Sequence, residues 1–430
     1  MNLSLFIILR NKPKSVLRAG VMLERYDLII IGAGASGLAS AVRAGEKGAH
    51  VIALEKSDRP GRKILASGNG RCNLMNKGEA DHYHGDACFA RAVLQQFGPE
   101  QLRSFFHRCG LLLREEEEGR IYPVTNQSAS VLKALRVSAE TMGVRFTGHS
   151  EAVEVLKEHN CFRVITLDRK EYLGEKVLIA CGGAAQPRLG GSWDGYRLLQ
   201  AFGHRVAKPM PALVPVATEA KCISGLSGIR AKCVLTLKKS DGRAVCRENG
   251  EILFTDYGVS GICVMQCSGS VEEGDFFEAD FLAPVFSDEN EAAKEIAYRI
   301  EHFRDREPLS ILEGILVPKL AFAVLKQAGF ALRNERVSDI PEDSVNRILQ
   351  AATHYRICGL SRRGLDQAQV TAGGVICDEF DPASMESRLI PGLYAAGEVL
   401  NVYGDCGGFN LMFAFSSGIV AAEHAVGEVQ

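Results

Sequence analysis

The sequence predicts an α/β protein in which both ends of the chain form a Rossmann-type parallel sheet, interrupted by an antiparallel β segment and a helical segment. Three observations indicate this. An apolar strand runs into a glycine turn and a helix near the N-terminus. Strands that end in glycine return at residues 176–183 and 392–399, and alternating runs with turn pairs fill part of the interval between them.

The first element is the apolar run at residues 26–31, which is typical of a strand buried on both faces. The turn that follows contains Gly32, Gly34, Ala35, Ser36 and Gly37, and a helix is expected at 38–47. Such glycines permit a tight turn, close approach to a pyrophosphate and close helix packing, and the helix N-terminus offers free N–H groups. A second apolar run at 51–54 ends at Glu55, about 20 residues after the first glycine, where a carboxylate can bind a ribose. This order predicts a dinucleotide site, the alternative being an ordinary glycine-rich turn.

The segment 61–73 has neither strand alternation nor a helical period, so we expect an extended loop. Its small residues, its amides and the basic side chains of Arg62, Lys63 and Arg71 suit a flat, polyanionic ligand. A plain surface loop is the alternative.

Helices are expected at 89–97, 99–109 and 128–142, antiparallel strands within 144–173, and a return to the parallel sheet at 176–183. Residues 208–211 read as a linker, and Asp241-Gly242 and Asn249-Gly250 as hairpin turns beyond it. A final helix at 411–426, behind a Gly-Gly turn, offers a second anion-stabilising N-terminus.

These patterns divide the chain into a disordered leader, two parts of a dinucleotide-binding domain, and inserted segments. The expected boundaries are 1–21 for the leader, 22–210 for the first part, 211–287 for a β-barrel, 288–346 for a helical insert, 347–365 for the return through the barrel, and 366–430 for the second part.

Composition excludes several classes of protein. The net charge of −2 gives no general attraction to nucleic acid or to anionic lipid. No stretch reads as a membrane span, since the apolar run at 3–9 is far too short. Thirteen cysteines form no CxxC pair, which predicts no metal site, and the closest two, Cys263 and Cys267, are expected to be buried free thiols. The odd count favours a reducing cytoplasm.

Three longer motifs carry a family resemblance. They are Gly61-Arg62-Lys63 through Arg71-Cys72-Asn73, the run at 369–375, and Gly397-Glu398 through 407–411. Together they resemble the BaiN-like flavoproteins, also called aminoacetone-oxidase-like, from about residue 26 to the end of the chain. The resemblance implies a two-part FAD domain interrupted by a β-barrel with a helical insert. Residues 1–21 have no counterpart in the family pattern.

The resemblance also implies roles for particular residues. Gly32, Gly34, Ala35, Ser36, Gly37, Glu55 and Lys56 would hold the adenosine diphosphate half of FAD, and Val153 would contact the adenine through its backbone. Arg62, Lys63, Gly70, Arg71, Cys72, Asn73 and Gly182 would lie along the pyrophosphate and the flavin. Gly397 and Glu398 would bind the ribityl chain, and Asn410 and Leu411 would present N–H groups to the flavin pyrimidine edge.

The family implies hydride transfer to conjugated double bonds of 3-oxo bile-acid intermediates, which needs a hydrogen-bond donor at the ketone and a proton source. Tyr122 and Tyr403 are the candidates, although a buried or surface tyrosine is the simpler interpretation of each. Cys72 lacks the cysteine partner of disulfide reductases, because Lys77 stands five positions later, so a dithiol mechanism is disfavoured. His82 and His84 have no third ligand nearby in the sequence, which favours a surface role.

No second glycine fingerprint follows a strand elsewhere, so NAD(P)H is expected to dock transiently over the flavin. We therefore expect an FAD-dependent, NAD(P)H-linked reductase of 3-oxo-4,6-diene bile acids, acting on a small apolar substrate, without nucleic acid or membrane. The alternatives are an amine oxidase that uses oxygen and, less favoured, an RNA-modifying flavoprotein.

Overall fold

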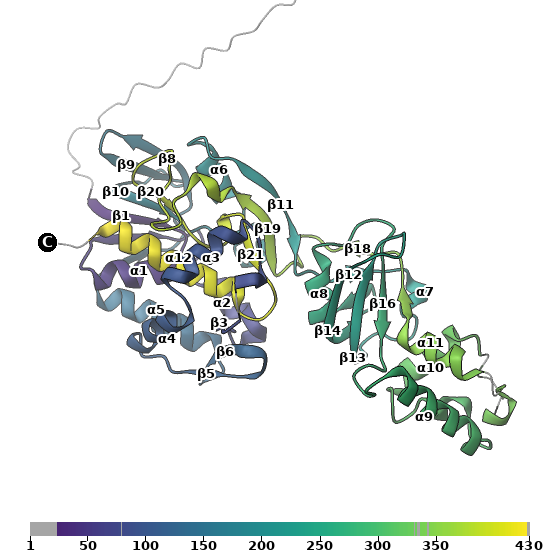
Figure 1. Cartoon of the computed structure of the whole chain (residues 1–430). Helices are drawn as coiled ribbons and strands as arrows, with labels where there is room; N and C mark the ends of the chain where they lie inside the picture. The colour runs from purple at the N-terminus through teal and green to yellow at the C-terminus, as the bar shows by residue number, and fades with distance from the viewer. Residues whose placement is uncertain (1–23, 79, 331, 333–335, 342–343, 428–430) are drawn as a thin grey trace, which may run out of the picture.

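The protein is seen here as a computed structural model, which describes residues 24–427 apart from 79, 331, 333–335 and 342–343. The predicted leader lies outside the described residues. The chain forms two lobes joined by a pair of strands (Figure 1). The larger lobe contains both ends of the described chain and the smaller lobe contains its middle, and each lobe has its own hydrophobic core.

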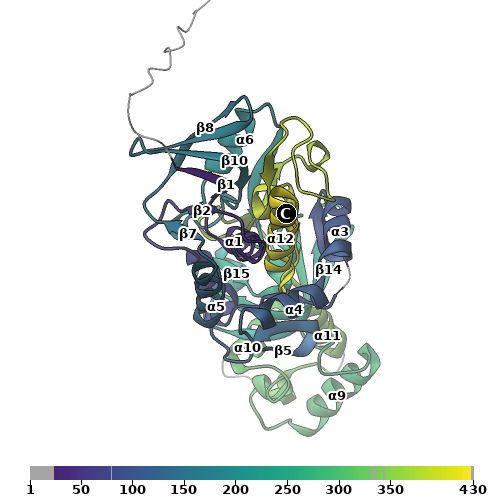
Figure 2. The ribbon, with the colours of Figure 1, turned by 90° about the vertical axis from the view of Figure 1, so that its left-hand side faces the viewer.

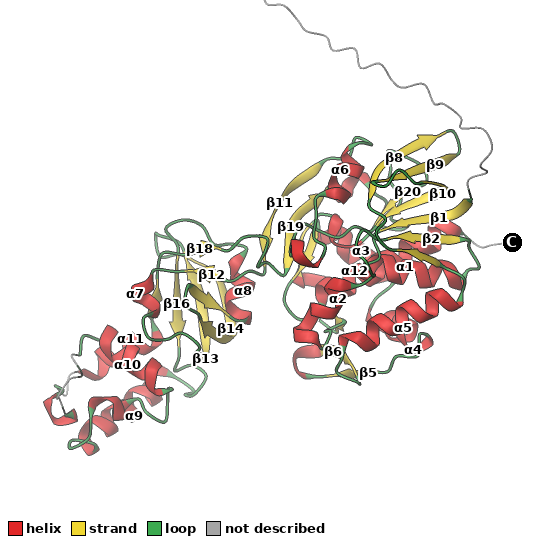
Figure 3. Ribbon diagram, turned by 180° about the vertical axis from the view of Figure 1, so that it is seen from behind, coloured by secondary structure: helices red, strands yellow, loops and turns green. Residues whose placement is uncertain are grey.

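The larger lobe is built on a seven-stranded sheet with the order β7-β2-β1-β10-β9-β8, in which β20 also pairs with β10. The bounds are β1 (Arg25–Ile31), β2 (Val51–Leu54), β7 (Arg145–Thr147), β8 (Ala152–Glu158), β9 (Cys161–Thr166), β10 (Glu171–Ile179) and β20 (Leu393–Ala395). Strand β1 is parallel to β2 and β10, and β10 is parallel to β20, so strands from both ends of the chain share one sheet (Figure 3). The predicted α/β fold with a Rossmann-type sheet is therefore confirmed. Of the strands predicted in 144–173, β8 and β9 are antiparallel, but β7 is parallel to β2.

Two helices, α1 (Ala35–Glu46) and α12 (Phe409–Val426), pack side by side in this lobe (Figure 2). Gly418 makes this approach possible, because a Cβ at that position would lie 2.3 Å from the Ser36 carbonyl oxygen. The Ser40 hydroxyl donates a hydrogen bond to the Gly418 carbonyl at 2.8 Å. By length and composition α12 is apolar enough to cross a membrane, which the sequence analysis did not expect, but 67% of it is buried inside the protein. It is a core helix.

Five further helices belong to this lobe (Figure 1). They are α2 (Arg62–Ala66), α3 (Ala87–Gln96), α4 (Pro99–Arg108), α5 (Ser128–Thr141) and α6 (Asp194–Gln200). Two small antiparallel sheets accompany them, one of β3 (Met75–Asn76), β6 (Arg120–Pro123) and β5 (Leu113–Glu115), the other of β4 (Tyr83–Gly85) and β21 (Val402–Gly404).

Helix α2 corrects the expectation of an extended loop at 61–73. Gly61 adopts φ 74°, which turns the chain, and the five residues after it are good helix formers. A 3-10 turn at Ser67–Gly70 follows. The helix buries Ile64, packs on α5, and its Leu65 carbonyl accepts a hydrogen bond from the Ser128 hydroxyl at 2.9 Å. Tertiary contacts thus stabilise a helix too short to show a period.

Residues 208–211 do connect the two lobes, as predicted for a linker, but they belong to strand β11 (Val206–Ala212), which pairs antiparallel with β19 (Val370–Val375). This two-stranded ribbon joins the lobes (Figure 1). Pro209 and Pro211 are tolerated because a strand with a single neighbour needs only half of its N–H groups for pairing.

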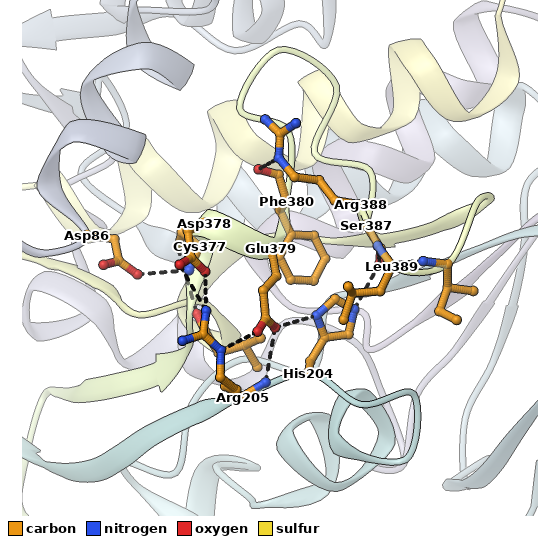
Figure 4. A network of polar contacts seen from close by, with 12 residues as sticks. Asp86, His204, Arg205, Cys377, Asp378, Glu379, Phe380, Ser387, Arg388 and Leu389 are labelled. Carbon is orange, nitrogen blue, oxygen red and sulfur yellow. Dashed lines mark hydrogen bonds and ion pairs between the residues drawn. The ribbon is translucent and has the colours of Figure 1, made fainter.

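At the base of the ribbon, a polar network holds both strands to the larger lobe (Figure 4). The His204 ring lies between the Glu379 carboxylate and the Ser387 hydroxyl, each at 2.9 Å, and its burial lowers the pKa of His204. Arg205 pairs with Asp378 at 2.8 Å and with Glu379 at 2.5 Å. Strand β11 begins directly after Arg205 and β19 ends shortly before Asp378, so the network anchors the base of the ribbon.

The smaller lobe contains a seven-stranded antiparallel sheet with the order β17-β16-β13-β14-β15-β12-β18. The bounds are β12 (Val216–Ala217), β13 (Arg230–Lys238), β14 (Ala244–Phe254), β15 (Gly258–Ser260), β16 (Phe276–Asp280), β17 (Tyr355–Ile357) and β18 (Ser361–Arg362). Helices α7 (Ala220–Ile223), α8 (Ile262–Ser268), α9 (Glu289–His302), α10 (Pro318–Gln327) and α11 (Val345–Thr353) accompany it. Helices α9 to α11 lie at the end of the lobe far from the sheet of the larger lobe (Figure 1).

One of the two predicted hairpin turns is confirmed. Asp241-Gly242 lies between β13 and β14, but Asn249-Gly250 lies inside β14, where Gly250 pairs with Cys233. A Cβ at Gly250 would lie 3.3 Å from the Cβ of Cys263, so the glycine allows α8 to pack closely on the strand. Close packing, not a turn, accounts for this glycine.

The same contact corrects the thiol prediction. Cys267 on α8 forms a disulfide with Cys246 on β14, their Cα atoms 5.7 Å apart, whereas Cys263 is buried and free as expected. The two bonded cysteines are far enough apart in sequence that their spacing gives no sign of the pairing.

Candidate functional site

A cavity of about 840 Å³ lies where the two lobes meet. The larger lobe contributes the first glycine turn, the segment around α2, the end of β10 and the loop that leads into α12. The smaller lobe contributes a few side chains, among them Arg230, Glu251, Ile262 and Met265. This volume is in the range of small-molecule and cofactor sites.

The three glycines of the first turn have different functions. Gly32 adopts φ 99°, and a Cβ there would lie 2.5 Å from the Ala180 carbonyl oxygen. A Cβ at Gly37 would lie 1.9 Å from the Gly32 carbonyl oxygen. A Cβ at Gly34 meets no heavy atom of the described chain within 4 Å, and Gly34 lines the cavity. Gly32 and Gly37 therefore allow packing, while Gly34 leaves room for a ligand to approach the backbone.

Glu55 fixes the shape of this turn. Its carboxylate accepts hydrogen bonds from the backbone N–H groups of Ala33 at 3.0 Å and Ser57 at 2.9 Å. Lys56 beside it pairs with Asp194 at 3.4 Å. Both Glu55 and Lys56 line the cavity.

Glu398 ties three distant segments together at the cavity wall. One of its oxygens accepts a hydrogen bond from Lys63 Nζ at 2.9 Å, and the other accepts one from the Thr371 N–H at 2.9 Å. The side chains of Lys63 and Glu398 are 28% and 19% exposed, so the pair is partly screened from water.

The N-terminus of α12 forms another wall. Gly407 and Gly408 adopt φ 127° and 106°, which brings the helix start against the cavity. The Asn410 side chain exchanges hydrogen bonds with the N–H and the carbonyl of Gly404, both at 2.7 Å, and so closes the preceding loop. A helix start in this position presents a positive dipole end to the cavity.

Both predicted tyrosines line the cavity. The guanidinium of Arg71 lies 4.2 Å from the centre of the Tyr122 ring, and Arg71 pairs with Glu116 at 2.6 Å. Burial raises the pKa of Tyr403, so its phenol keeps its proton at neutral pH. Both tyrosines therefore stand where a molecule bound in the cavity would contact the wall.

His82 and His84, for which the sequence suggested no partner, meet a third group in the fold. Asp405 accepts hydrogen bonds from both rings, at 2.9 Å from His82 Nδ1 and 2.7 Å from His84 Nε2. No metal-binding group of three or more such side chains occurs among the described residues.

The cavity fits an extended dinucleotide such as FAD. It runs from the N-terminus of α1 to that of α12, so anion-stabilising helix starts stand at two places along it. Basic side chains of Lys56, Arg62 and Lys63 lie between them. The Asn73 side-chain oxygen is fully buried without a hydrogen-bond partner in the described chain, although Asn73 itself is on the cavity wall.

Comparison with known proteins agrees with this geometry. Residues 26–424 match the family described as HI0933-like protein Rossmann domain. The chain belongs to this family. It is 36% identical, over 92% of its length and 98% of the relative, to the 3-dehydro-bile acid delta(4,6)-reductase of Clostridium scindens. It is 29% identical, over 94% of its length and 99% of the relative, to the ribosomal RNA dihydrouridine synthase of Escherichia coli.

Among solved structures, 3-ketosteroid delta1-dehydrogenase from Sterolibacterium denitrificans shares the fold of this HI0933-like chain. The TM-score is 0.50 at 12% identity, over 94% of this chain and 99% of that one. At this identity the likeness shows the fold alone. The family membership confirms the resemblance seen in the sequence motifs.

Most of the sequence-predicted cofactor residues of the HI0933-like chain lie on the cavity wall. They are Gly32, Gly34, Ala35, Ser36, Glu55, Lys56, Arg62, Lys63, Arg71, Asn73, Gly182, Glu398, Asn410 and Leu411. Gly37, Gly70, Cys72, Val153 and Gly397 are not among the lining residues. Gly37 and Gly397 support the wall from behind, since a Cβ at Gly397 would lie 2.7 Å from the Ser36 hydroxyl oxygen. Beside Val153, Glu151 and Ala152 do reach the cavity.

Sequence reasoning missed other lining residues. Ser57 lines the cavity and could have been predicted, because it directly follows Lys56 just beyond the end of the same strand. Asp405 and Gly407 lie inside the C-terminal motif and were noticed only as part of its turn. Ile262 and Met265 come from the smaller lobe, and no local pattern links them to the glycine turns.

Alanine at Cys72 is expected to leave flavin reduction and substrate reduction nearly unchanged, because Cys72 is buried off the cavity and burial raises the pKa of its thiol to about 11. A nucleophilic cysteine needs a lowered pKa instead. Steady-state oxidoreductase kinetics of the FAD-loaded Cys72→Ala variant would check this. Loss of turnover in a protein that still binds FAD would point to a thiol mechanism.

Proposed function

We propose that this chain is an FAD-dependent oxidoreductase that reduces a carbon–carbon double bond conjugated with a carbonyl group. The observation that carries the proposal is the convergence of the two glycine turns, at residues 32–37 and 404–408, on one cavity lined by basic and amide groups. The names of the two relatives support it, since a delta(4,6)-reductase and a dihydrouridine synthase both saturate double bonds of this kind.

The chain's own residues would bind and orient the cofactor. Lys56 and Arg62, with the N–H groups at the start of α1, line the cavity and would bind the diphosphate, and Glu398 would bind the ribityl chain. The start of α12, at Asn410 and Leu411, stabilises negative charge at the pyrimidine edge. When bound, FAD supplies hydride to the substrate.

The substrate needs two further groups from the protein. As hydride adds to the far carbon of the double bond, negative charge develops on the carbonyl oxygen, and a hydrogen-bond donor there lowers the barrier. Tyr122 and Tyr403 both have O–H groups on the cavity wall and would fill this position. A proton must then reach the other carbon.

NAD(P)H is the proposed electron donor. The sequence has one glycine fingerprint of the dinucleotide-binding kind, so the nicotinamide would dock transiently in the open part of the cavity and alternate with the substrate. We also propose a cytoplasmic location. The support is that eleven free thiols outnumber the single disulfide pair in the described chain, because free thiols persist in reducing compartments.

For the substrate, we propose a 3-oxo-4,6-diene bile acid. The support is the relative at 36% identity, the higher of the two identities given above. An apolar steroid skeleton also suits the part of the cavity lined by Ile262, Met265 and Leu253 of the smaller lobe.

Uridine in ribosomal RNA is a second candidate, favoured by the dihydrouridine synthase, which matches nearly the whole chain. The net charge of −2 speaks against general RNA binding, but Arg62, Arg120 and Arg230 line the cavity and offer local contacts to phosphates.

Anaerobic incubation of the FAD-loaded protein with NADH or NADPH tests the two candidates side by side. We expect the dienone to be consumed, with the product detected by mass spectrometry, and an unmodified ribosomal RNA transcript to remain unchanged. Conversion of the RNA alone would replace the bile-acid proposal with the second candidate. Peroxide formation with aminoacetone in air, without conversion of either compound, would instead indicate an amine oxidase.

A further inference from the structure

The cluster of His82, His84 and Asp405 joins the cavity to solvent. Strand β4 pairs with β21, which places His84 directly opposite Tyr403, their ring centres 5.0 Å apart. Asp405 follows β21 and lines the cavity. The side chains of His82 and His84 are 47% and 46% exposed, while that of Asp405 is 20% exposed. Asp405 is therefore the member of the cluster that lines the cavity, and the two rings are the more exposed members.

The cluster is held rigidly from both lobes. The His82 ring stacks on Phe409, the first residue of α12, with centres 4.4 Å apart. Asn410 donates to the Asp405 carbonyl at 3.3 Å, and the Cys406 N–H donates to Gln266 of the smaller lobe at 2.6 Å. These contacts fix the position of Asp405 on the cavity wall. An ordinary ion pair on the protein surface needs no such fixed position.

We propose that His84 and Asp405 form a proton relay that carries a proton from water to the substrate in the cavity. This inference rests on the proposed reductase function. Reduction of each double bond consumes one hydride, donated by the reduced cofactor, and one proton. Starting from the imidazolium form of His84, with both ring nitrogens protonated, the Nε2 proton would pass to Asp405 as Asp405 gives a proton to the substrate. His84 would then be neutral with its proton on Nδ1, and Nε2 would regain a proton from water to restore the imidazolium.

The surrounding charges favour transfer of the proton from His84 through Asp405 to the substrate. The hydrogen bond that His84 donates to the Asp405 carboxylate raises the pKa of His84 and so favours the protonated ring. Burial alone would raise the pKa of Asp405, but its bonds with His84 and His82 lower it, so it releases a proton readily. Glu248 on β14 also faces the cluster, and burial raises its pKa. The other ionisable groups around the cluster are Tyr403, Cys406, Arg120 and Arg362.

Three variants test the relay. Asp405→Asn keeps an acceptor oxygen for one of the two rings, places an amide N–H₂ group against the other, and cannot carry a proton. His84→Gln keeps a donor to Asp405. His302→Gln is the control, because His302 on α9 is 48% exposed and bonds to the Tyr298 carbonyl far from the cavity. Each variant would be loaded with FAD, and its two half-reactions followed separately by stopped flow without oxygen.

We expect reduction of the flavin by NAD(P)H to stay within about twofold of wild type in all variants. Reoxidation by the dienone, by the RNA transcript or by cyclohexenone as a simple conjugated ketone should slow by about 100-fold in Asp405→Asn and His84→Gln. The wild-type reoxidation rate should fall as pH rises through the pKa of His84, and this limb should disappear in His84→Gln.

The outcomes separate the two proposals. If wild type passes electrons to none of these acceptors, the proposed function fails and the relay with it. If wild type reduces one of them and Asp405→Asn does so equally fast, or slows equally in both half-reactions, only the relay fails. An independent check is the NMR titration of His84, whose pKa should fall in Asp405→Asn, and an unchanged titration would contradict the proposed pairing.

Discussion

The Gly34→Ala variant is expected to fold normally and to purify without FAD. A Cβ at Gly34 meets no described heavy atom within 4 Å, and its φ of −80° is ordinary for alanine, so the folded chain tolerates the methyl group. The methyl group points into the space that the pyrophosphate would occupy, where the backbone must approach the ligand closely. We expect FAD affinity to fall by at least about 100-fold, which corresponds to about 2.7 kcal/mol.

Gly37→Ala, three positions along the same turn, provides the contrast. Its Cβ would lie 1.9 Å from the Gly32 carbonyl oxygen, so the helix and the strand must move apart even without cofactor. We expect a loss of about 4 kcal/mol in the free energy of unfolding. Thermal unfolding of the two apoproteins, with FAD titration by fluorescence, separates the effects. If Gly34→Ala bound FAD as tightly as wild type, the pyrophosphate would not lie at this turn.

The second large effect is expected at Glu398. Glu398→Ala removes the partner of Lys63 and the acceptor of the Thr371 N–H, as well as the proposed ligand of the ribityl chain. We expect the free energy of unfolding of the apoprotein to fall by about 2 kcal/mol, because a partly buried N–H and an ammonium group lose their partner. FAD affinity should fall by about 100-fold. Glu398→Gln keeps an acceptor for the Thr371 N–H, so it should lose less stability and less FAD affinity than Glu398→Ala.

Glu423→Ala is the matched control. Glu423 pairs with Arg43 at the other end of α12, with side chains 28% and 23% exposed, and it does not line the cavity. It should cost about 1 kcal/mol of stability and leave FAD affinity unchanged. If both variants lost FAD to the same extent, a general loosening of α12 would explain the result better than a role of Glu398 at the cofactor.

Local patterns predicted the parts of the site that lie close together in sequence. The strand at 26–31, the glycine turn and Glu55 form one βαβ unit, whose hydrophobic run and turn chemistry specify its structure locally. Gly397 and Glu398 were recognised for the same reason, as a strand that ends in glycine and an acid. These are the segments that form the two main walls of the cavity.

Features that depend on contacts between distant segments were missed. Helix α2 is stabilised by its packing on α5, and β11 by pairing with β19 more than 150 residues later, so neither carries a local signal. The pairing of β4 with β21 brings Asp405 to His82 and His84, which were interpreted as surface residues because no ligand stood near them in sequence. The disulfide of Cys246 and Cys267 likewise follows from α8 lying on β14.

Titration of FAD into the purified full-length protein, followed by its absorbance and by calorimetry, tests the central claim most directly. We expect saturation at a single FAD per chain, with a yellow protein that NAD(P)H bleaches in the absence of oxygen. A folded protein that stays colourless and takes up no added FAD would contradict the convergence of the two glycine turns on one cofactor.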